Sequence, residues 1–165
     1  MVYGQIRYKR SSNRNGKECH RFLTSPVPWN RQPAEVALAL CAIGTRDAKQ
    51  ATEMYDALKI AAGQMIGSDL ISGDRLLGLL AGVLDDPNLA ASHFDAAIEF
   101  CKKAGYRPEL AWTNSDYAEF LVARDADRAR EKATELQDEA IAIATELGMQ
   151  PLLERVLAQR ETLKA

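Results

Sequence analysis

The sequence predicts an all-α fold, an array of antiparallel helix pairs that follows an irregular N-terminal arm. Three observations support this prediction. Apolar patterns of helical period follow one another from Ala34 onward, small residues recur at fixed offsets, and aromatic residues make up only 7% of the 165 residues. Alanine and leucine supply most of the apolar content, and they suit closely packed helices better than sheets.

The charge and the apolar pattern of the sequence both change at residue 33. Residues 1–33 hold seven Lys and Arg against one Glu, a net charge of +6, whereas residues 34–165 hold 14 against 22, a net charge of −8. Pro26, Pro28 and Pro33 exclude a helix through the end of the first part, so residues 1–33 are expected to be a basic irregular segment. Residues 34–165 are expected to form the helical repeat domain.

Seven helical segments are predicted in the second part, from apolar residues three and four apart and from helix-end signals. Thr45 is expected to cap the second helix, and Asp86 with Pro87 is expected to begin the fourth. Gly105 and Gly148 mark two helix ends. The expected ranges are 34–43, 47–62, 74–84, 87–103, 109–123, 128–147 and 151–162.

The decisive signal is an internal repeat of small residues at fixed offsets. Five positions recur 43 residues later: Ala90, Ala97, Gly105, Pro108 and Leu110 return as Ala133, Ala140, Gly148, Pro151 and Leu153. Three others recur after 39 residues: Ala39, Ala51 and Tyr55 correspond to Gly78, Ala90 and Phe94. Small residues let paired helices approach closely, and one aromatic residue fills the groove between them.

This order of small, small, aromatic and small residues resembles the tetratricopeptide repeat (TPR), with Gln137 at one aromatic position. The resemblance implies a TPR-like right-handed array of about three repeats, with a capping helix from Pro151 onward. Residues 93–97, 105–108, 116–118 and 146–149 are also similar to the C-terminal helical repeats of bacterial adenylate/guanylate cyclase-like and LuxR-type ATPase regulators. That second resemblance covers roughly residues 50–150. It implies a non-catalytic signalling or regulatory scaffold.

In this register, the first helices of the repeats line a concave groove. The predicted groove residues are Arg75, Leu79, Val83, Trp112, Ser115 and Glu119. An apolar lining with a few polar groups suits a helix or an extended peptide, so a protein or peptide partner is expected. Two alternatives stay open, because Trp112 can equally be a core residue and the N-terminal segment or a neighbouring subunit can fill the groove.

Other functions also stay open. Arg7, Lys9, Arg10 and Arg14 lie in a basic stretch interleaved with aromatic residues, a composition that suits a nucleic-acid adaptor. The groove can instead belong to a small-ligand sensor of a transcriptional regulator. Apolar first helices leave homo-oligomerisation open.

Signals for catalysis, metals and membranes are weak in the sequence. Cys19 and His20 lack further ligands at a chelating spacing, and His93 is expected at a surface or boundary position. No Gly-Lys-Ser/Thr motif is present to form a phosphate-binding loop. No apolar run reaches the roughly 18 residues of a membrane span. We therefore expect no catalytic residues, metal or cofactor, no membrane association, and a cytoplasmic location.

Overall fold

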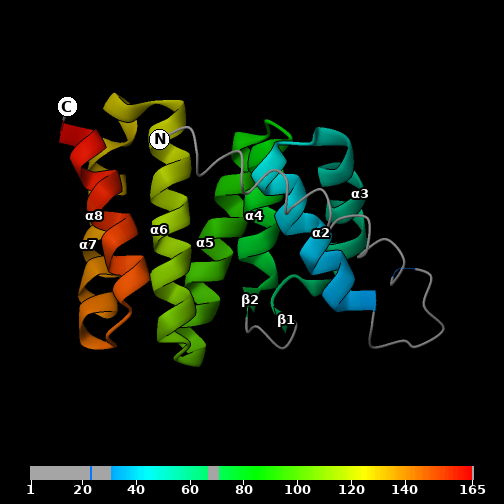
Figure 1. Ribbon diagram of the computed structural model, residues 1–165, viewed down its shortest axis with the longest axis horizontal. Helices are drawn as coiled ribbons and strands as arrows, with labels where there is room; N and C mark the ends of the chain where they lie inside the picture. The colour runs from blue at the N-terminus through cyan, green and yellow to red at the C-terminus, as the bar shows by residue number, and fades with distance from the viewer. Residues whose placement is uncertain (1–22, 24–30, 67–70, 165) are drawn as a thin grey trace. The chain divides into compact units, whose positions relative to one another are not determined.

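The computed structural model describes Leu23, residues 31–66 and residues 71–164, excluding the side chains of residues 126–128 and 162–164. These residues are mostly helical, which confirms the all-α prediction (Figure 1). The helices are α2 (Arg31–Thr45), α3 (Ala48–Leu58), the 3-10 helix η2 (Lys59–Ala61), α4 (Gly73–Val83), α5 (Pro87–Ala104), α6 (Arg107–Arg124), α7 (Ala126–Glu146) and α8 (Gln150–Lys164). No helix in the described residues is long and apolar enough to cross a membrane.

Two predictions about helix ends are wrong. Helix α2 begins at Arg31, so Pro33 lies in its first turn, where proline costs little because the amides there have no partner inside the helix. Thr45 does not cap α3, because its hydroxyl donates to the carbonyl oxygen of Cys41 at 2.8 Å. Asp47 caps α3 instead, and its carboxylate accepts the Gln50 amide at 3.1 Å.

The chain divides into two compact units, the first ending at His93 and the second beginning at Phe94. In the first unit, α2, α3 and α4 pack against one another around an apolar core. Leu38, Leu76, Leu77 and Leu80 are completely buried in it. Leu23 also packs against this core, so a residue from within the basic segment contributes to the first unit.

Two short strands between η2 and α4 were not predicted. Strands β1 (Met65–Ile66) and β2 (Ile71–Ser72) pair antiparallel, with Met65 opposite Ser72 and Ile66 opposite Ile71. Both isoleucines are buried in the first core, and β-branched residues suit an extended backbone. The Gly73 amide then donates to the carbonyl oxygen of Gln64 at 2.9 Å, which fixes the start of α4 against the preceding turn.

The second unit contains the last part of α5 with α6, α7 and α8. Helix α7 packs against both α6 and α8 (Figure 1). The small residues of the predicted repeat lie in its interior, where Ala97, Ala118, Ala133 and Ala140 are completely buried. The rings of Phe94 and Tyr117 stack in the same unit, with their centroids 4.8 Å apart.

Turns that lie 39 residues apart share one backbone hydrogen bond. In the turn from α2 to α3, the Asp47 amide donates to the Ala42 carbonyl at 3.0 Å, and in the turn from α4 to α5 the Asp86 amide donates to the Ala81 carbonyl at 3.1 Å. Both donors and both acceptors are 39 residues apart. This bond from an amide to a carbonyl five residues earlier is the Schellman motif of helix C-termini.

In the second unit, two turns that lie 43 residues apart share the same backbone hydrogen bond. The Tyr106 amide donates to the Cys101 carbonyl at 3.0 Å, and the Met149 amide, 43 residues later, donates to the Ala144 carbonyl at 2.8 Å. The residues before these donors, Gly105 and Gly148, have φ angles of 74° and 66°. The small-residue repeat in the sequence therefore coincides with a repeated helix–turn–helix backbone.

Candidate functional site

The predicted groove residues of the first unit lie on α4. Arg75, Leu79 and Val83 are spaced four residues apart along this helix, and each is partly exposed. Val83 also packs against the first core. Arg75 and Leu79 therefore supply a charged and an apolar side chain that a partner can reach.

The other three groove residues lie on α6 in the second unit, and they differ in exposure. Trp112 is partly buried and packs against the second apolar core, Ser115 is completely buried, and Glu119 is exposed. The sequence left open whether Trp112 belongs to the core or to the surface, and the structure places it at the boundary. The predicted arm residues Arg7, Lys9, Arg10 and Arg14 lie outside the described residues.

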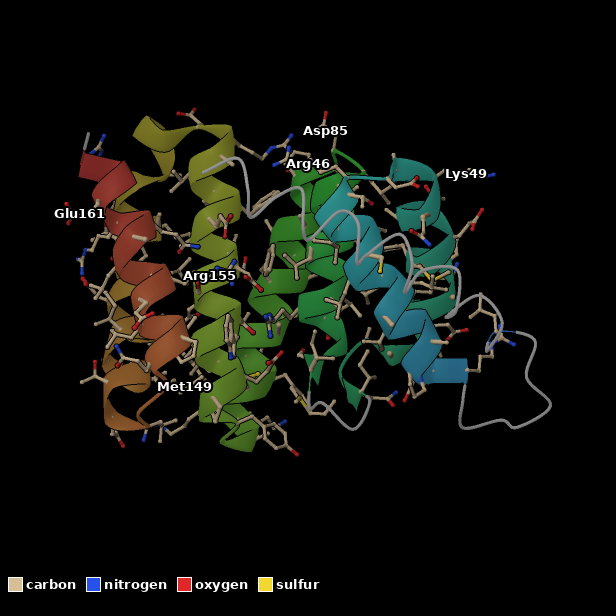
Figure 2. All side chains as sticks on the ribbon, viewed as in Figure 1. Arg46, Lys49, Asp85, Met149, Arg155 and Glu161 are labelled. Carbon is tan, nitrogen blue, oxygen red and sulfur yellow. The ribbon has the colours of Figure 1, made fainter. Side chains whose placement is uncertain are left out.

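Helix α8 supplies an arginine that joins two carboxylates of α6. Arg155 Nη2 lies 2.7 Å from Asp116 Oδ1 and 2.6 Å from Glu119 Oε2. Its guanidinium carbon lies 5.7 Å from the centroid of the Trp112 ring, within the range of a cation–π contact. Arg155 projects from α8 on the side of α6 (Figure 2). We call Trp112, Asp116, Glu119, Arg155 and Gln159 the α6/α8 face.

Gln159 extends this connection by one turn of α8. Its Nε2 donates to Glu119 Oε2 at 2.8 Å, and its Oε1 accepts the Ser115 hydroxyl at 3.5 Å. Ser115 therefore makes its contact inside the protein rather than on an open surface.

Arg155 stays protonated although it is partly buried. Burial lowers the pKa of Arg155, but the carboxylates of Asp116 and Glu119 raise it by more than burial lowers it. The pKa of Arg155 therefore lies above its ordinary value. One cation therefore faces two carboxylates, which leaves these three ionised groups with a net negative charge. An aromatic ring beside such a group of charges suits polar and cationic side chains of a partner.

Sequence reasoning missed Asp116, Arg155 and Gln159. The spacing of Trp112 and Glu119 predicted that both lie along one side of α6, but nothing local identifies α8 as the neighbour of that side. Arg155 and Gln159 lie four residues apart on α8, among the polar residues of that helix. Their contacts with α6 depend on how the helices pack.

Buried polar groups continue along α6. Asn114 is completely buried, and its Nδ2 donates to Glu139 Oε2 of α7 at 2.8 Å. Lys102 Nζ of α5 lies 3.0 Å from the other oxygen of the same carboxylate. These contacts favour one alignment of α5, α6 and α7, because sliding α7 along α6 would separate the buried Asn114 from its partner Glu139.

A second polar cluster joins three helices of the first unit. His93 of α5 places Nδ1 at 2.9 Å from Asp74 Oδ1 of α4, and its Nε2 lies 2.8 Å from the Tyr55 hydroxyl of α3. The other oxygen of Asp74 accepts the Gly63 amide at 2.6 Å. We call Tyr55, His93 and Asp74 the tyrosine–histidine–aspartate chain.

The surroundings of this cluster shift the pKa values of Asp74 and Tyr55 in opposite directions. Burial raises the pKa of Asp74, but hydrogen bonds from His93 and the Gly63 amide lower it more, so the net pKa lies below the ordinary value. Burial raises the pKa of Tyr55, and the carboxylates of Asp86, Asp56 and Asp74 raise it further while Lys59 opposes them. At neutral pH the aspartate is ionised and the tyrosine is protonated.

The sequence predicted only the approximate position of His93. Its side chain is 16% exposed and that of Asp74 is 6% exposed, so the histidine stands at a boundary and the aspartate inside. Tyr55, which the sequence singled out as a repeat position, is partly buried and packs against the first core. No spacing in the sequence indicates that these residues meet, because each comes from a different helix.

No cluster of three or more His, Cys, Asp and Glu side chains that could hold a metal ion occurs in the described part of the chain. Comparisons of the whole chain with known protein families, with curated proteins and with solved structures give no match.

Proposed function

We propose that the chain is a non-catalytic protein-interaction or scaffold module, a TPR-like array that binds a peptide or protein segment. The observation that supports this most is the repeated helix–turn–helix backbone, with the same turn hydrogen bond at offsets of 39 and 43 residues. Arrays of this kind present side chains from successive helices on a common binding surface. The resemblance to bacterial regulators suggests a signalling or regulatory protein as its setting.

The accessible side chains suit a peptide better than a small apolar ligand. Arg75 and Leu79 of α4 are partly exposed, and the α6/α8 face offers an aromatic ring beside ionised groups. Interfaces with proteins combine such aromatic and arginine anchors with a polar rim. We therefore expect a partner segment that brings both apolar and charged side chains.

The test begins with the intact chain as bait, followed by measurement of the dissociation constant with the purified partner. Trp112→Ala and Arg75→Ala are each expected to weaken binding at least about tenfold, as anchor residues do. Glu53→Ala of α3 and Glu135→Ala of α7 are the matched controls, because both residues are exposed and lie outside the predicted groove. Circular dichroism would confirm that all four variants are folded.

The outcomes separate this proposal from the two other functions. If all four variants bound the partner with equal affinity, the predicted groove would not be the binding site. Captured nucleic acid that is lost on deleting residues 1–30, with binding that weakens steeply with salt, would move the function to the basic arm. A metabolite that raises the thermal midpoint of the intact chain, and loses this effect in Trp112→Ala, would favour a small-ligand sensor.

A further inference from the structure

We propose that Tyr55 is an acyl-acceptor residue, whose hydroxyl takes an acyl group from a neutral activated ester or thioester with His93 as the base. The inference rests on the tyrosine–histidine–aspartate chain alone and is independent of the proposed binding function. The three side chains have the order of a nucleophile, a base and an orienting carboxylate, the arrangement that activates hydroxyl nucleophiles.

The direction of each hydrogen bond follows from the ionised aspartate. A carboxylate only accepts hydrogen bonds, so Nδ1 of His93 must carry a hydrogen to bond Asp74 Oδ1 at 2.9 Å. In the neutral imidazole, Nε2 then holds a lone pair and accepts the hydroxyl hydrogen of Tyr55 at 2.8 Å. The proton that the tyrosine must lose therefore already points at a base within transfer distance.

The base is also held in place. Asp74 is buried at the start of α4, where the Gly63 amide fixes its second oxygen at 2.6 Å. The ring of His93 lies against the ring of Tyr55 in an edge-on contact, with the centroids 5.8 Å apart. A base with so little freedom loses little entropy when the reaction begins. Tyr55 itself is only partly buried, so a donor in solution can approach it.

The charges near Tyr55 select the class of donor. The carboxylates of Asp86, Asp56 and Asp74 all act on its hydroxyl, Asp86 most strongly, and the ammonium group of Lys59 opposes them in part. This surplus of negative charge repels anionic donors such as phosphoryl groups, whereas a neutral acyl donor meets no such barrier. The tyrosine stays protonated until the base removes its proton during attack.

The chemical step is an ordinary acyl transfer. The Tyr55 oxygen forms a bond to the carbonyl carbon of the donor, and the bond from that carbon to the leaving alkoxide or thiolate breaks. The proton passes from the tyrosine to Nε2 of His93 and then to the leaving group. The product is an ester of Tyr55, and no oxidant or metal takes part in this balance.

Tyr106 and Tyr117 provide controls inside the same molecule. Tyr106 is 41% exposed and Tyr117 is 1% exposed, so reaction governed by exposure alone would modify Tyr106 first. The intact chain would be treated with 4-nitrophenyl acetate, and the acetylation rate of each tyrosine followed by peptide mass spectrometry. We expect Tyr55 to react at least about tenfold faster than Tyr106. A Tyr106 rate equal to or above that of Tyr55 would overturn the proposal.

Two variants test the roles of the base and the carboxylate. His93→Gln and Asp74→Asn are each expected to lower the ratio of Tyr55 to Tyr106 acetylation about tenfold or more, because one removes the base and the other its orientation. The ratio is read within one sample, and circular dichroism checks the fold of each variant. An unchanged ratio in folded His93→Gln would show that the tyrosine–histidine–aspartate chain only stabilises the packing of three helices.

The wild-type chain supplies a test that needs no variant. Base-assisted acetylation of Tyr55 should depend on pH less steeply than that of an unassisted phenol, which reacts faster with every further rise in pH. A donor carrying a carboxylate, 4-nitrophenyl hydrogen succinate, should modify Tyr55 more slowly than the acetate ester. A Tyr55 rate that follows the unassisted profile of Tyr106 would refute base assistance.

Discussion

Arg46 and Asp85 have the same left-handed backbone conformation, and they occupy equivalent positions in the turns from α2 to α3 and from α4 to α5. Their φ angles are 54° and 61°, and each residue precedes the aspartate that caps the following helix. In the corresponding turns of the second unit this position is glycine. The turn therefore demands a left-handed residue in all four places, and in two of them the sequence meets that demand at a steric cost.

Arg46→Gly is expected to stabilise the first unit. Glycine adopts a positive φ without the clash of a side chain, so the free energy of unfolding should rise by about 1 kcal/mol. The control is Glu53→Gly in the interior of α3, where glycine should lower stability by about the same amount. Urea unfolding followed by circular dichroism measures both. A loss of stability in Arg46→Gly would mean that the turn does not carry this strain.

Most of the fold follows from local signals in the sequence. The helices α2 to α8 were predictable because an apolar stripe, a capping aspartate such as Asp86 and a terminating glycine all act within one or two turns of the chain. Strands β1 and β2 were not, because two-residue strands depend on their pairing and on the burial of Ile66 and Ile71 in a core built elsewhere. The early start of α2 was missed because Pro33 was read as excluding helix there.

Gly73→Ala is expected to be strongly destabilising. A Cβ atom at this position would lie 2.0 Å from the carbonyl oxygen of Ala61, so the backbone of η2 or of α4 would have to move. The same displacement would disturb the contact between Gly63 and Asp74. We expect a loss of about 3 kcal/mol or more in the free energy of unfolding, as for other overpacked sites.

The control for this variant is Gly63→Ala. Its Cβ would meet no heavy atom within 4 Å, and the cost is limited to a φ of 72° in a residue with a side chain, about 1–2 kcal/mol. Thermal unfolding of the two variants should rank Gly73→Ala well below Gly63→Ala. The reverse order would show that the close approach of η2 to α4 is not tight in solution.

The candidate sites were predictable only where one helix carries them. The prediction for Trp112 and Glu119 rests on their spacing of seven residues, which places both on one side of a single helix. Asp116 and Arg155, and likewise Tyr55 and His93, make contacts between helices that are far apart in the sequence. Helical periodicity says which side of a helix a residue occupies, but not which helix faces that side.

Asp74 is expected to make stability depend on pH below about 5. Its pKa in the folded chain lies below the ordinary value near 3.9, so it contributes stability that is complete above the unfolded value and is lost as the pH falls through the folded value. Asp74→Asn should cost about 1–3 kcal/mol at pH 7, because hydrogen bonds to a charged group are lost.

The difference in the free energy of unfolding between the wild-type chain and Asp74→Asn should then become smaller as the pH falls. Urea unfolding at pH 7, 5, 4 and 3 measures this difference. Asp56→Asn is a control, since Asp56 is exposed and forms an exposed ion pair with Lys59, one turn away. A difference that stays constant from pH 7 to pH 3 would show that the ionised form of Asp74 is not what stabilises the fold.

Arg155→Met tests whether α8 is fixed to α6 through its charge or through its apolar packing. Methionine retains much of the apolar stem, and Leu152 and Val156 of the same helix remain completely buried in the second core. The variant removes the cation from Asp116, whose side chain is only 4% exposed. We expect a loss of about 2–3 kcal/mol, below the range for fully buried pairs because Arg155 is itself partly exposed.

A double-mutant cycle isolates the charge. Asp116→Asn in the Arg155→Met background should recover part of the loss, because a neutral amide is less costly to bury than a carboxylate that has lost the cation of Arg155. Arg160→Met is the control on the same helix, since its partner Asp138 is 58% exposed and such pairs contribute less than about 1 kcal/mol. Equal losses in Arg155→Met and Arg160→Met would show that the carboxylate of Asp116 does not depend on Arg155. In that case α8 would be held to the rest of the unit by Leu152 and Val156, and the α6/α8 face could change its polar contacts on binding without unfolding the helix.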